Sequence, residues 1–195
     1  MEIMNINRIK RGNRRLINII EDDWIMANRV AKFEKVSKNR FVQDLLHEFM
    51  GSEEWARVAY DSIKLPQRAT KFSAGYDFYS PLDFTLWPGN TIKIPTGIRC
   101  GMNTDWVLMI YIRSSLGFKY ALNLANQTAV IDSDYFYSDN EGHIFIKLIN
   151  NGDKSVHIKA GEAFAQGIFM QYGITEDDHV ETSRNGGFGS TDKKE

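Results

Sequence analysis

Two short polar segments of this chain combine groups that can handle a phosphate ester. Val130-Ile131-Asp132-Ser133-Asp134-Tyr135 places carboxylates directly after an apolar run, where Asp132 can take a proton from an attacking water molecule. Arg113-Ser114-Ser115-Leu116-Gly117 joins a guanidinium fork to hydroxyl and backbone donors, which suits phosphate oxygens. An isolated aspartate of this kind more often forms a turn or an ion pair. The chemistry therefore has to be judged from several segments together.

Three further segments stand in order around these two. Ala74-Gly75-Tyr76-Asp77 lies upstream, and Gly161-Glu162-Ala163-Phe164-Ala165-Gln166 and Arg184-Asn185-Gly186-Gly187-Phe188-Gly189-Ser190-Thr191 lie downstream. From about Leu65 to Thr191, the five segments resemble the motifs of the trimeric deoxyuridine triphosphatases (dUTPases). Their order makes the resemblance specific, because Gly-Gly-Phe-Gly or Arg-Ser-Ser alone recurs by chance. The sequence has no Gly-x-x-x-x-Gly-Lys phosphate loop, which excludes a Walker-type nucleotidase.

The resemblance implies hydrolysis of dUTP to dUMP and diphosphate, with water attacking the α-phosphate. Asp132 matches the family's aspartate that activates this water, and Asp77 is implied as the second acidic residue of the site. The implied cofactor is Mg²⁺, held chiefly by triphosphate oxygens and waters, with Asp77 reaching it at most through water. Because the segments contain no acidic cluster, we expect the protein alone to bind the ion weakly.

Phosphate binding is implied for the second, fourth and fifth segments. Arg113 is expected to pair with Asp77 and hold the site together, while Gly117 lets the backbone come close to the ligand. Ser114 and Ser115 are implied at the α- and β-phosphates. Gln166 is implied as a further phosphate contact, and Arg184, Ser190 and Thr191 are implied to bind the γ-phosphate. Gly189 is implied to bind the substrate.

Base and sugar selection are implied for three other residues. Asn126 stands at the family's spacing before Asp132 for the residue of the uracil pocket. A hydrogen-bonded pocket edge can reject a wrong partner by about 10⁴–10⁵, so cytosine should be excluded strongly. Tyr135 is implied to lie under the deoxyribose and leave no room for a 2′-hydroxyl. Phe188, in the Gly-rich tail, is implied to close over the base.

The chain also departs from the family pattern. Ala129 stands where glycine is usual, and its methyl group is expected to narrow the uracil pocket or disturb the backbone there. Ala163 replaces a common arginine, and Asp192 stands where the tail often has glycine. Residues Phe136–Gly142 resemble an inserted loop seen in some bacterial and phage members, which could alter a partner surface.

Composition frames these expectations. The chain has 195 residues, 43% of them hydrophobic, and a formal net charge of −1, which suits one core with an appendage. The near-neutral balance argues against nucleic-acid binding, and no apolar run approaches the roughly 20 residues that cross a bilayer. The start lacks a secretory pattern, so we expect a cytoplasmic protein. Cys100, the single cysteine, excludes an internal disulfide and indicates a small buried residue.

The chain is expected to divide near Leu65. Residues 1–64 form an N-terminal extension with amphipathic helices, the first of them over Arg40–Phe49 and ending before Gly51. Ser52 is expected to cap a second helix. The residues expected to face inward from that second helix are Trp55, Val58 and Ala59.

After Leu65, short apolar runs alternate with turns. Trp106–Ile112 and His143–Ile149 are nearly continuous apolar runs, and Pro88-Gly89-Asn90 predicts a turn between two strands. Many short strands predict a β-sandwich or barrel. The dUTPase resemblance narrows this to an all-β, jelly-roll-like β-barrel over residues 65–180, followed by a flexible tail, 181–195, that closes the active site. It also implies a homotrimer with shared active sites.

Two alternatives stay open at this point. A dCTP deaminase shares the fold, but the Asp132–Tyr135 segment and the Gly-Gly-Phe-Gly tail fit the hydrolase better. The other is a nucleotide-gated regulatory protein, in which residues 1–60 or the loop Phe136–Gly142 engage a protein partner. Loss of a partner on deletion of residues 1–60, with hydrolysis unchanged, would support the second as an added role.

Overall fold

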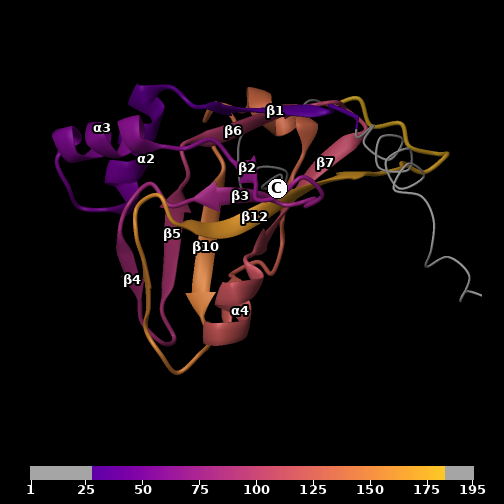
Figure 1. Ribbon diagram of the computed structural model, residues 1–195. Coiled ribbons are helices and arrows are strands. Elements are labelled where there is room, and N and C mark those ends of the chain that lie inside the picture. The colour runs from indigo at the N-terminus through magenta and orange to yellow at the C-terminus, as the bar shows by residue number, and fades with distance from the viewer. Residues whose placement is uncertain (1–27, 183–195) are drawn as a thin grey trace, which may run out of the picture. The chain divides into compact units, whose positions relative to one another are not determined.

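A computed structural model of the chain describes residues 28–182 (Figure 1). The contacts within the chain separate residues 1–30 from residues 31–195, and the fold below is that of the described part of the second unit. Most of the regular secondary structure in the described part of this unit consists of short strands, and all of the pairings between them are antiparallel. The prediction of an all-β fold is therefore confirmed.

The strands form four sheets. The largest contains, in spatial order, β2 (Gln67–Arg68), β3 (Tyr76–Tyr79), β12 (Ala163–Gln171), β7 (Trp106–Ile112) and β9 (Ala129–Ile131). A second contains β5 (Thr91–Pro95), β10 (Phe145–Asn150) and β8 (Leu122–Leu124). The two remaining pairs are β4 (Phe84–Leu86) with β11 (Val156–Ile158), and β1 (Ala31–Lys35) with β6 (Ile98–Met102). In Figure 1, β3 and β12 run across the barrel while β4, β5 and β10 stand upright beneath them.

Apolar side chains from these sheets and from several helices meet in a continuous core. Residues alternate between core and surface along β10, as expected for strands with one buried face. Cys100 is the small buried residue that the sequence predicts, and burial raises the pKa of its thiol to about 12. The largest fully buried side chains are Phe41, Leu45, Phe78, Ile94, Leu108, Ile110, Leu122, Ile144, Ile146, Leu148, Ile158 and Phe164.

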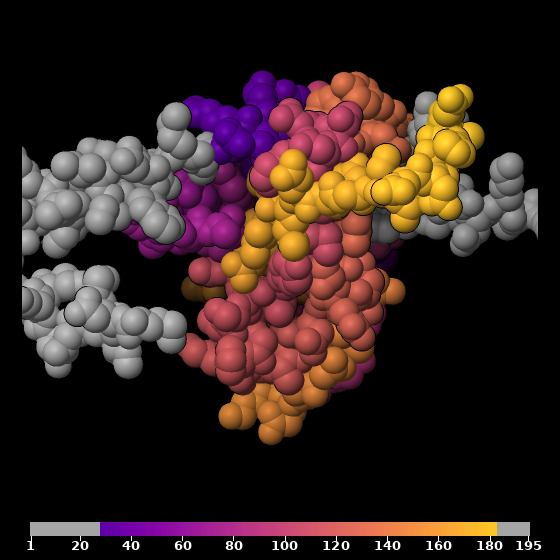
Figure 2. Space-filling view, turned by 90° about the vertical axis from the view of Figure 1, so that its right-hand side faces the viewer, coloured from indigo at the N-terminus to yellow at the C-terminus, as the bar shows by residue number. Residues whose placement is uncertain are grey.

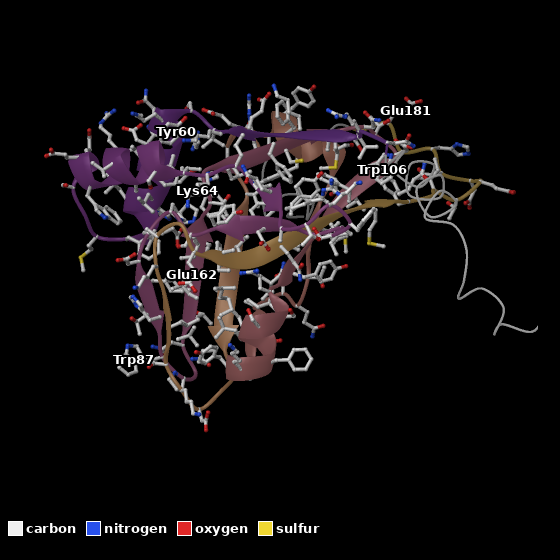
Figure 3. The ribbon with its side chains drawn as sticks, in the orientation of Figure 1. Tyr60, Lys64, Trp87, Trp106, Glu162 and Glu181 are labelled. Atoms are coloured by element: carbon white, nitrogen blue, oxygen red, sulfur yellow. The ribbon has the colours of Figure 1, made fainter. Side chains whose placement is uncertain are left out.

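The predicted strand Trp106–Ile112 is present with these bounds as β7. The second predicted run forms β10, which begins at Phe145 rather than His143. The predicted turn is also present, since the Asn90 amide donates to the Trp87 carbonyl at 3.1 Å and Gly89 has φ +74°. Trp87 itself points outward (Figure 3). The flanking strands β4 and β5 do not pair with each other, because each pairs with a later strand.

Two helices precede the barrel's first long strands. Helix α2 spans Lys38–Glu48, begins after the N-cap Ser37, and ends at Phe49 in an extended conformation. Helix α3 spans Glu53–Ser62, and the Ser52 hydroxyl accepts the Trp55 amide at 3.1 Å, which is the predicted cap. Strand β1 and helix α2 belong to the same unit as the barrel, whereas the division of the chain at residue 64 stays a prediction.

The inward face of α3 differs from the prediction. Ala59 is buried as expected, but Val58 is 65% exposed and Trp55 is 36% exposed, so the prediction for these two was wrong. Ala56 is buried instead. The small alanine face lets α3 lie close to α2, and spacing alone did not distinguish it from the adjacent bulky face. Across residues 28–182, no helix has the length and apolar character needed to span a membrane.

Candidate active site

Asp77, Arg113 and Gln166 come together on three neighbouring strands or their ends. The Arg113 Nε lies 3.2 Å from Asp77 Oδ1, which is the ion pair expected from the sequence. Gln166 pairs in register with Asp77 on one side and with Tyr111 on the other, so it stands between β3 and β7. Its side-chain amide donates to the Ile112 carbonyl at 3.4 Å. The sheet thus places a cation, an anion and an amide in one cluster.

Gly75 explains how Gln166 fits into this cluster. A Cβ atom at Gly75 would lie 2.6 Å from the Gln166 Oε1, which is closer than real contacts of this kind. The absence of a side chain at residue 75 therefore leaves room for the Gln166 amide. Arg113 is held from another side, because its Nη1 donates to the Ala163 carbonyl at 3.5 Å.

Ser114 and Ser115 begin the short helix α4 (Ser114–Tyr120), directly after Arg113. Both serines are exposed, so their hydroxyl groups are accessible to a ligand. Gly117 lies in the same helix, and a Cβ there would make only an ordinary contact, 3.5 Å from Ile112 Cγ2. Among the described residues of one chain, then, none sterically requires glycine at residue 117, and its implied role toward the phosphates stays a prediction.

Asp132 follows strand β9 and precedes the 3₁₀ helix η2 (Ser133–Tyr137). It is half-buried, with an extended backbone of φ −75° and ψ 158°. Tyr135 lies in η2 and is only 5% exposed. Its hydroxyl donates to the His143 carbonyl at 2.7 Å and accepts from the Asn140 amide at 2.7 Å. The ring expected to support the sugar is therefore fixed at its hydroxyl end.

Asn126 lies in the turn between β8 and β9, beside a cavity of about 380 Å³. This volume falls within the roughly 300–1,000 Å³ usual for small-molecule sites. Ala129 is buried in β9 and its φ is negative, so its backbone does not require glycine. Ala129 does line the cavity, so a narrowing of the uracil pocket by its methyl group stays a prediction. The lining residues are Lys93, Leu124, Ala125, Asn126, Ala129, Phe145, Ile146 and Lys147.

Asp132 and the Arg113 cluster lie toward opposite ends of β7 within one chain. Ile131, next to Asp132, pairs with Leu108, whereas Arg113 follows the far end of the strand at Ile112. Five residues of extended strand between Leu108 and Arg113 correspond to about 17 Å. A single chain therefore does not bring the aspartate and the arginine to one phosphate group.

The predicted tail contacts lie outside the described residues. These are Arg184, Phe188, Gly189, Ser190 and Thr191. The described chain leads toward them over the exposed residues 172–182, which cross the surface after β12 (Figure 2, yellow). Gln171 and Tyr172 attach this segment to the β6–β7 turn, through bonds of 2.8 Å to Asp105 Oδ2 and 2.7 Å to the Thr104 carbonyl.

The described side chains do not form a metal-binding site by themselves. Among residues 28–182, no three His, Cys, Asp or Glu side chains gather closely enough to hold a metal ion. Asp77 carries a carboxylate toward the Arg113 cluster. Such a donor set fits an ion whose other ligands come from a triphosphate and water.

The family model described as dUTPase matches residues 61–192, and this range contains strands β2 to β12 and all five segments that resemble the family's motifs. This chain belongs to the dUTPase family. The deoxyuridine 5′-triphosphate nucleotidohydrolase of Lactococcus lactis subsp. lactis (strain IL1403) is 42% identical to it over 144 residues, or 72% of this chain and 96% of that relative. The enzyme of that name from Desulfitobacterium hafniense (strain DSM 10664 / DCB-2) is 42% identical over 66% of this chain and 87% of the relative.

Solved dUTPase structures support the fold. The dUTPase from Streptococcus mutans is 31% identical, with a TM-score of 0.57 over 74% of this chain and 98% of that chain. The dUTPase from phage phi11 of S. aureus, a structure that visualises a species-specific insert, is 18% identical with a TM-score of 0.56, and this similarity concerns the fold alone. The dUTPase β-barrel expected from the motifs is thus confirmed.

Some residues around the site were not found from the sequence. Lys93 and Phe145 line the cavity beside Asn126, and Asn140 and His143 hold the Tyr135 hydroxyl. No motif includes them. The one available signal was the position of Asn140 and His143 directly after the Asp132–Tyr135 segment, in and after the loop identified as an insertion.

Proposed function

We propose that this protein hydrolyses dUTP to dUMP and diphosphate. Its membership of the dUTPase family, over a range that spans all five motifs, carries the proposal. The cluster of Asp77, Arg113 and Gln166 supports it, because it supplies charged and polar groups suited to a polyphosphate.

In this proposal Asp132 accepts the proton of the attacking water. Its carboxylate follows the end of β9, and the backbone there is fixed by the Tyr135 amide, which donates to the Asp132 carbonyl at 3.2 Å. A base held in this way contributes about 10²–10⁴-fold to the rate. Ser114, Ser115 and Gln166 bind the α- and β-phosphates, and Arg113 is positioned by Asp77. The tail residues Arg184, Gly189, Ser190 and Thr191 bind the γ-phosphate.

Nucleotide selection falls to the cavity and to Tyr135. Asn126 and the neighbouring backbone read the edge of uracil, and Ala129 limits the room beside the base. The Tyr135 ring lies under the deoxyribose and excludes a 2′-hydroxyl. Phe188 closes over the base.

Mg²⁺ is part of the proposal. A structure of the phage phi11 dUTPase describes coordination of a structural Mg(II) ion, which supports this part of the proposal. When bound to the substrate, the ion would offset charge on the triphosphate oxygens. Asp77 is the residue of this chain that would face it, through water.

The proposed assembly is a homotrimer with shared active sites, acting in the cytoplasm. The separation of about 17 Å along β7 between the Asp132 end and Arg113 supports sharing, since a neighbouring subunit can supply the missing half. A regulatory protein partner is a second proposed role. Structures of phage dUTPases that control transfer of virulence genes favour it, although at 19% identity they resemble this chain in fold alone.

The deciding experiment offers the purified protein dUTP, dCTP, dTTP and UTP with Mg²⁺, and measures diphosphate and ammonia for each. Diphosphate from dUTP alone is expected. Ammonia from dCTP would replace the proposal with a deaminase, and the absence of both products with all four nucleotides would replace it with a binding role.

A further inference from the structure

The loop Phe136–Gly142 and the first residue after it, His143, pack against the start of helix α2; we call residues 136–143 the docking loop. The Ser37 amide donates to Glu141 Oε2 and the Ser37 hydroxyl donates to Glu141 Oε1, both at 2.7 Å. Arg40 Nη2 donates to the Asp139 carbonyl at 3.3 Å. The two carboxylate oxygens of Glu141 thus bind the N-cap of a helix that lies 104 positions away in the sequence.

The inner end of the docking loop is buried against the same helix. His143 is completely buried, and its Nδ1 lies 2.6 Å from Asp44 Oδ2. The Gly97 amide donates to His143 Nε2 at 2.8 Å. Since Nε2 accepts a hydrogen bond, Nδ1 carries the proton and donates it to Asp44, so the imidazole is neutral. Burial lowers the pKa of His143 despite the opposing effect of Asp44.

The docking loop in turn holds Tyr135. Asn140 Nδ2 donates to the Tyr135 hydroxyl at 2.7 Å and to the His143 carbonyl at 3.3 Å. The two ends of the loop pack closely, because a Cβ at Gly142 would lie 2.7 Å from the Phe136 Cα. Gly142 also has φ +69°, a conformation that favours glycine. The contacts therefore run without a gap from α2, through the docking loop, to the ring of Tyr135.

We propose that helix α2 positions Tyr135 through the docking loop and thereby strengthens selection of deoxyribonucleotides over ribonucleotides. Asn140 and Glu141 are the positioning residues, and Tyr135 is the residue that meets the sugar. This inference rests on the proposed function, which places Tyr135 under the deoxyribose. Helix α2 lies before residue 61, where the family match begins, so the device is an addition to the shared barrel.

The physical reason is rigidity. A 2′-hydroxyl fits only if the ring beneath the sugar gives way, and a ring anchored at its hydroxyl resists that movement. Steric selection of this kind discriminates by about 10–200-fold for a group of methylene size. A loosened ring should therefore lose on the order of tenfold in selectivity, mainly because UTP is accepted better.

The test compares kcat/KM for dUTP and UTP in Asn140→Ala, Glu141→Ala and a control. The control is Asp61→Asn, which removes a carboxylate from an exposed ion pair with Lys38 (2.6 Å) and does not touch the docking loop. We expect the dUTP-to-UTP ratio to fall about tenfold in both loop variants and to stay at the wild-type value in the control. If Glu141→Ala does not fold, Glu141→Gln replaces it, because the amide keeps one acceptor for Ser37.

Two further measurements separate this inference from the proposed function. Calorimetric binding of dUMP and UMP reports sugar selection without catalysis, and hydrogen exchange over residues 132–143 reports loosening of the loop. If wild-type protein releases no diphosphate while Asn140→Ala still loses its preference for dUMP, the proposed function fails and the positioning role stands. If the loop amides exchange faster in both variants but neither ratio changes, the docking loop is only structural and the inference is overturned.

Discussion

At the scale of single residues, Asp132 is the group on which the proposed chemistry depends most. Its backbone is fixed at the junction of β9 and η2, so an asparagine should occupy the same position without repacking. Asp132→Asn keeps the shape but cannot accept the water's proton. We expect turnover of dUTP to fall by at least about 10²-fold while nucleotide binding persists. Steady-state rates together with calorimetric binding of dUMP measure both quantities.

Asp134→Asn is the matched control for that variant. Asp134 lies two residues away, is exposed, and is assigned no contact with substrate. It should lose far less activity than Asp132→Asn. Near-normal turnover in Asp132→Asn, or equal losses in both variants, would remove Asp132 from its role as the base.

Gly75 offers a second residue-scale prediction. An added methyl group would approach Gln166 Oε1 to 2.6 Å, and this oxygen is the free end of a flexible side chain. Gly75→Ala should therefore move the Gln166 amide while leaving the fold intact. Loss of one hydrogen bond to a charged phosphate predicts a decrease in kcat/KM on the order of tenfold.

The control for Gly75→Ala is Gly173→Ala, where an added Cβ meets no atom of the described residues within 4 Å. Thermal unfolding of both variants should match the wild type. A large loss of stability in Gly75→Ala would mean that the backbone, rather than Gln166, gives way, and the phosphate role of Gln166 would lose this support.

At the scale of elements, local patterns were read correctly wherever neighbouring residues decide the structure. The apolar spacing predicted α2, the serine at residue 52 predicted the start of α3, and the continuous apolar run predicted β7. The prediction for the inward face of α3 was wrong. Two adjacent faces of this helix carry apolar residues, and only packing against α2 selects the face with the alanines. Local patterns could not predict the contact between the docking loop and α2, because Glu141 and Ser37 are 104 positions apart in the sequence.

The joint between α2 and the docking loop should make stability depend on pH. Burial lowers the pKa of His143 below the value of about 6.5 that it has in the unfolded chain. As pH falls, His143 therefore becomes protonated in the unfolded chain at a higher pH than in the folded chain. The contribution of neutral His143 to the free energy of unfolding is complete above about pH 6.5 and is lost as pH falls below that value. Unfolding temperatures measured from neutral to mildly acidic pH at constant protein concentration test this.

Replacement of single histidines identifies the group responsible. His143→Gln should flatten the decline below about pH 6.5, although its stability at neutral pH is lower. His157→Gln should retain the wild-type profile, because His157 is exposed and shares its hydrogen bond with Thr85 on the exposed side of β4. Burial raises the pKa of Glu141, but the two hydrogen bonds from Ser37 together with the charges of Arg40 and Arg99 lower it overall, so that group titrates at lower pH. An unchanged profile in His143→Gln would assign the decline elsewhere.

At the scale of the whole molecule, the position of the motifs on one sheet limits what a single chain can do. The sequence motifs predict which residues form the site, and this set stays a prediction, but their order along the chain carries no information on which ends of β7 they occupy. The pairing of Ile131 with Leu108, in contrast, separates the Asp132 end from Arg113 by about 17 Å. In this conformation of the chain, the motifs can form one site only if different subunits contribute them, as proposed above.

Mixing two inactive variants tests that arrangement directly. Asp132→Asn and Arg113→Ala each damage one half of the site, and co-refolding them in equal amounts produces mixed trimers. If each site takes its aspartate from one chain and its arginine from a neighbour, random assembly leaves about a quarter of the sites intact, and about that fraction of wild-type turnover should return. Each variant refolded alone, and the two variants mixed after folding without exchange, should remain inactive. If both residues instead acted within one chain, no mixture could restore a site, because every chain would carry one of the two lesions. Activity of mixed trimers near zero, with trimers verified by light scattering, would therefore show that one chain closes the distance by a conformational change instead of by sharing.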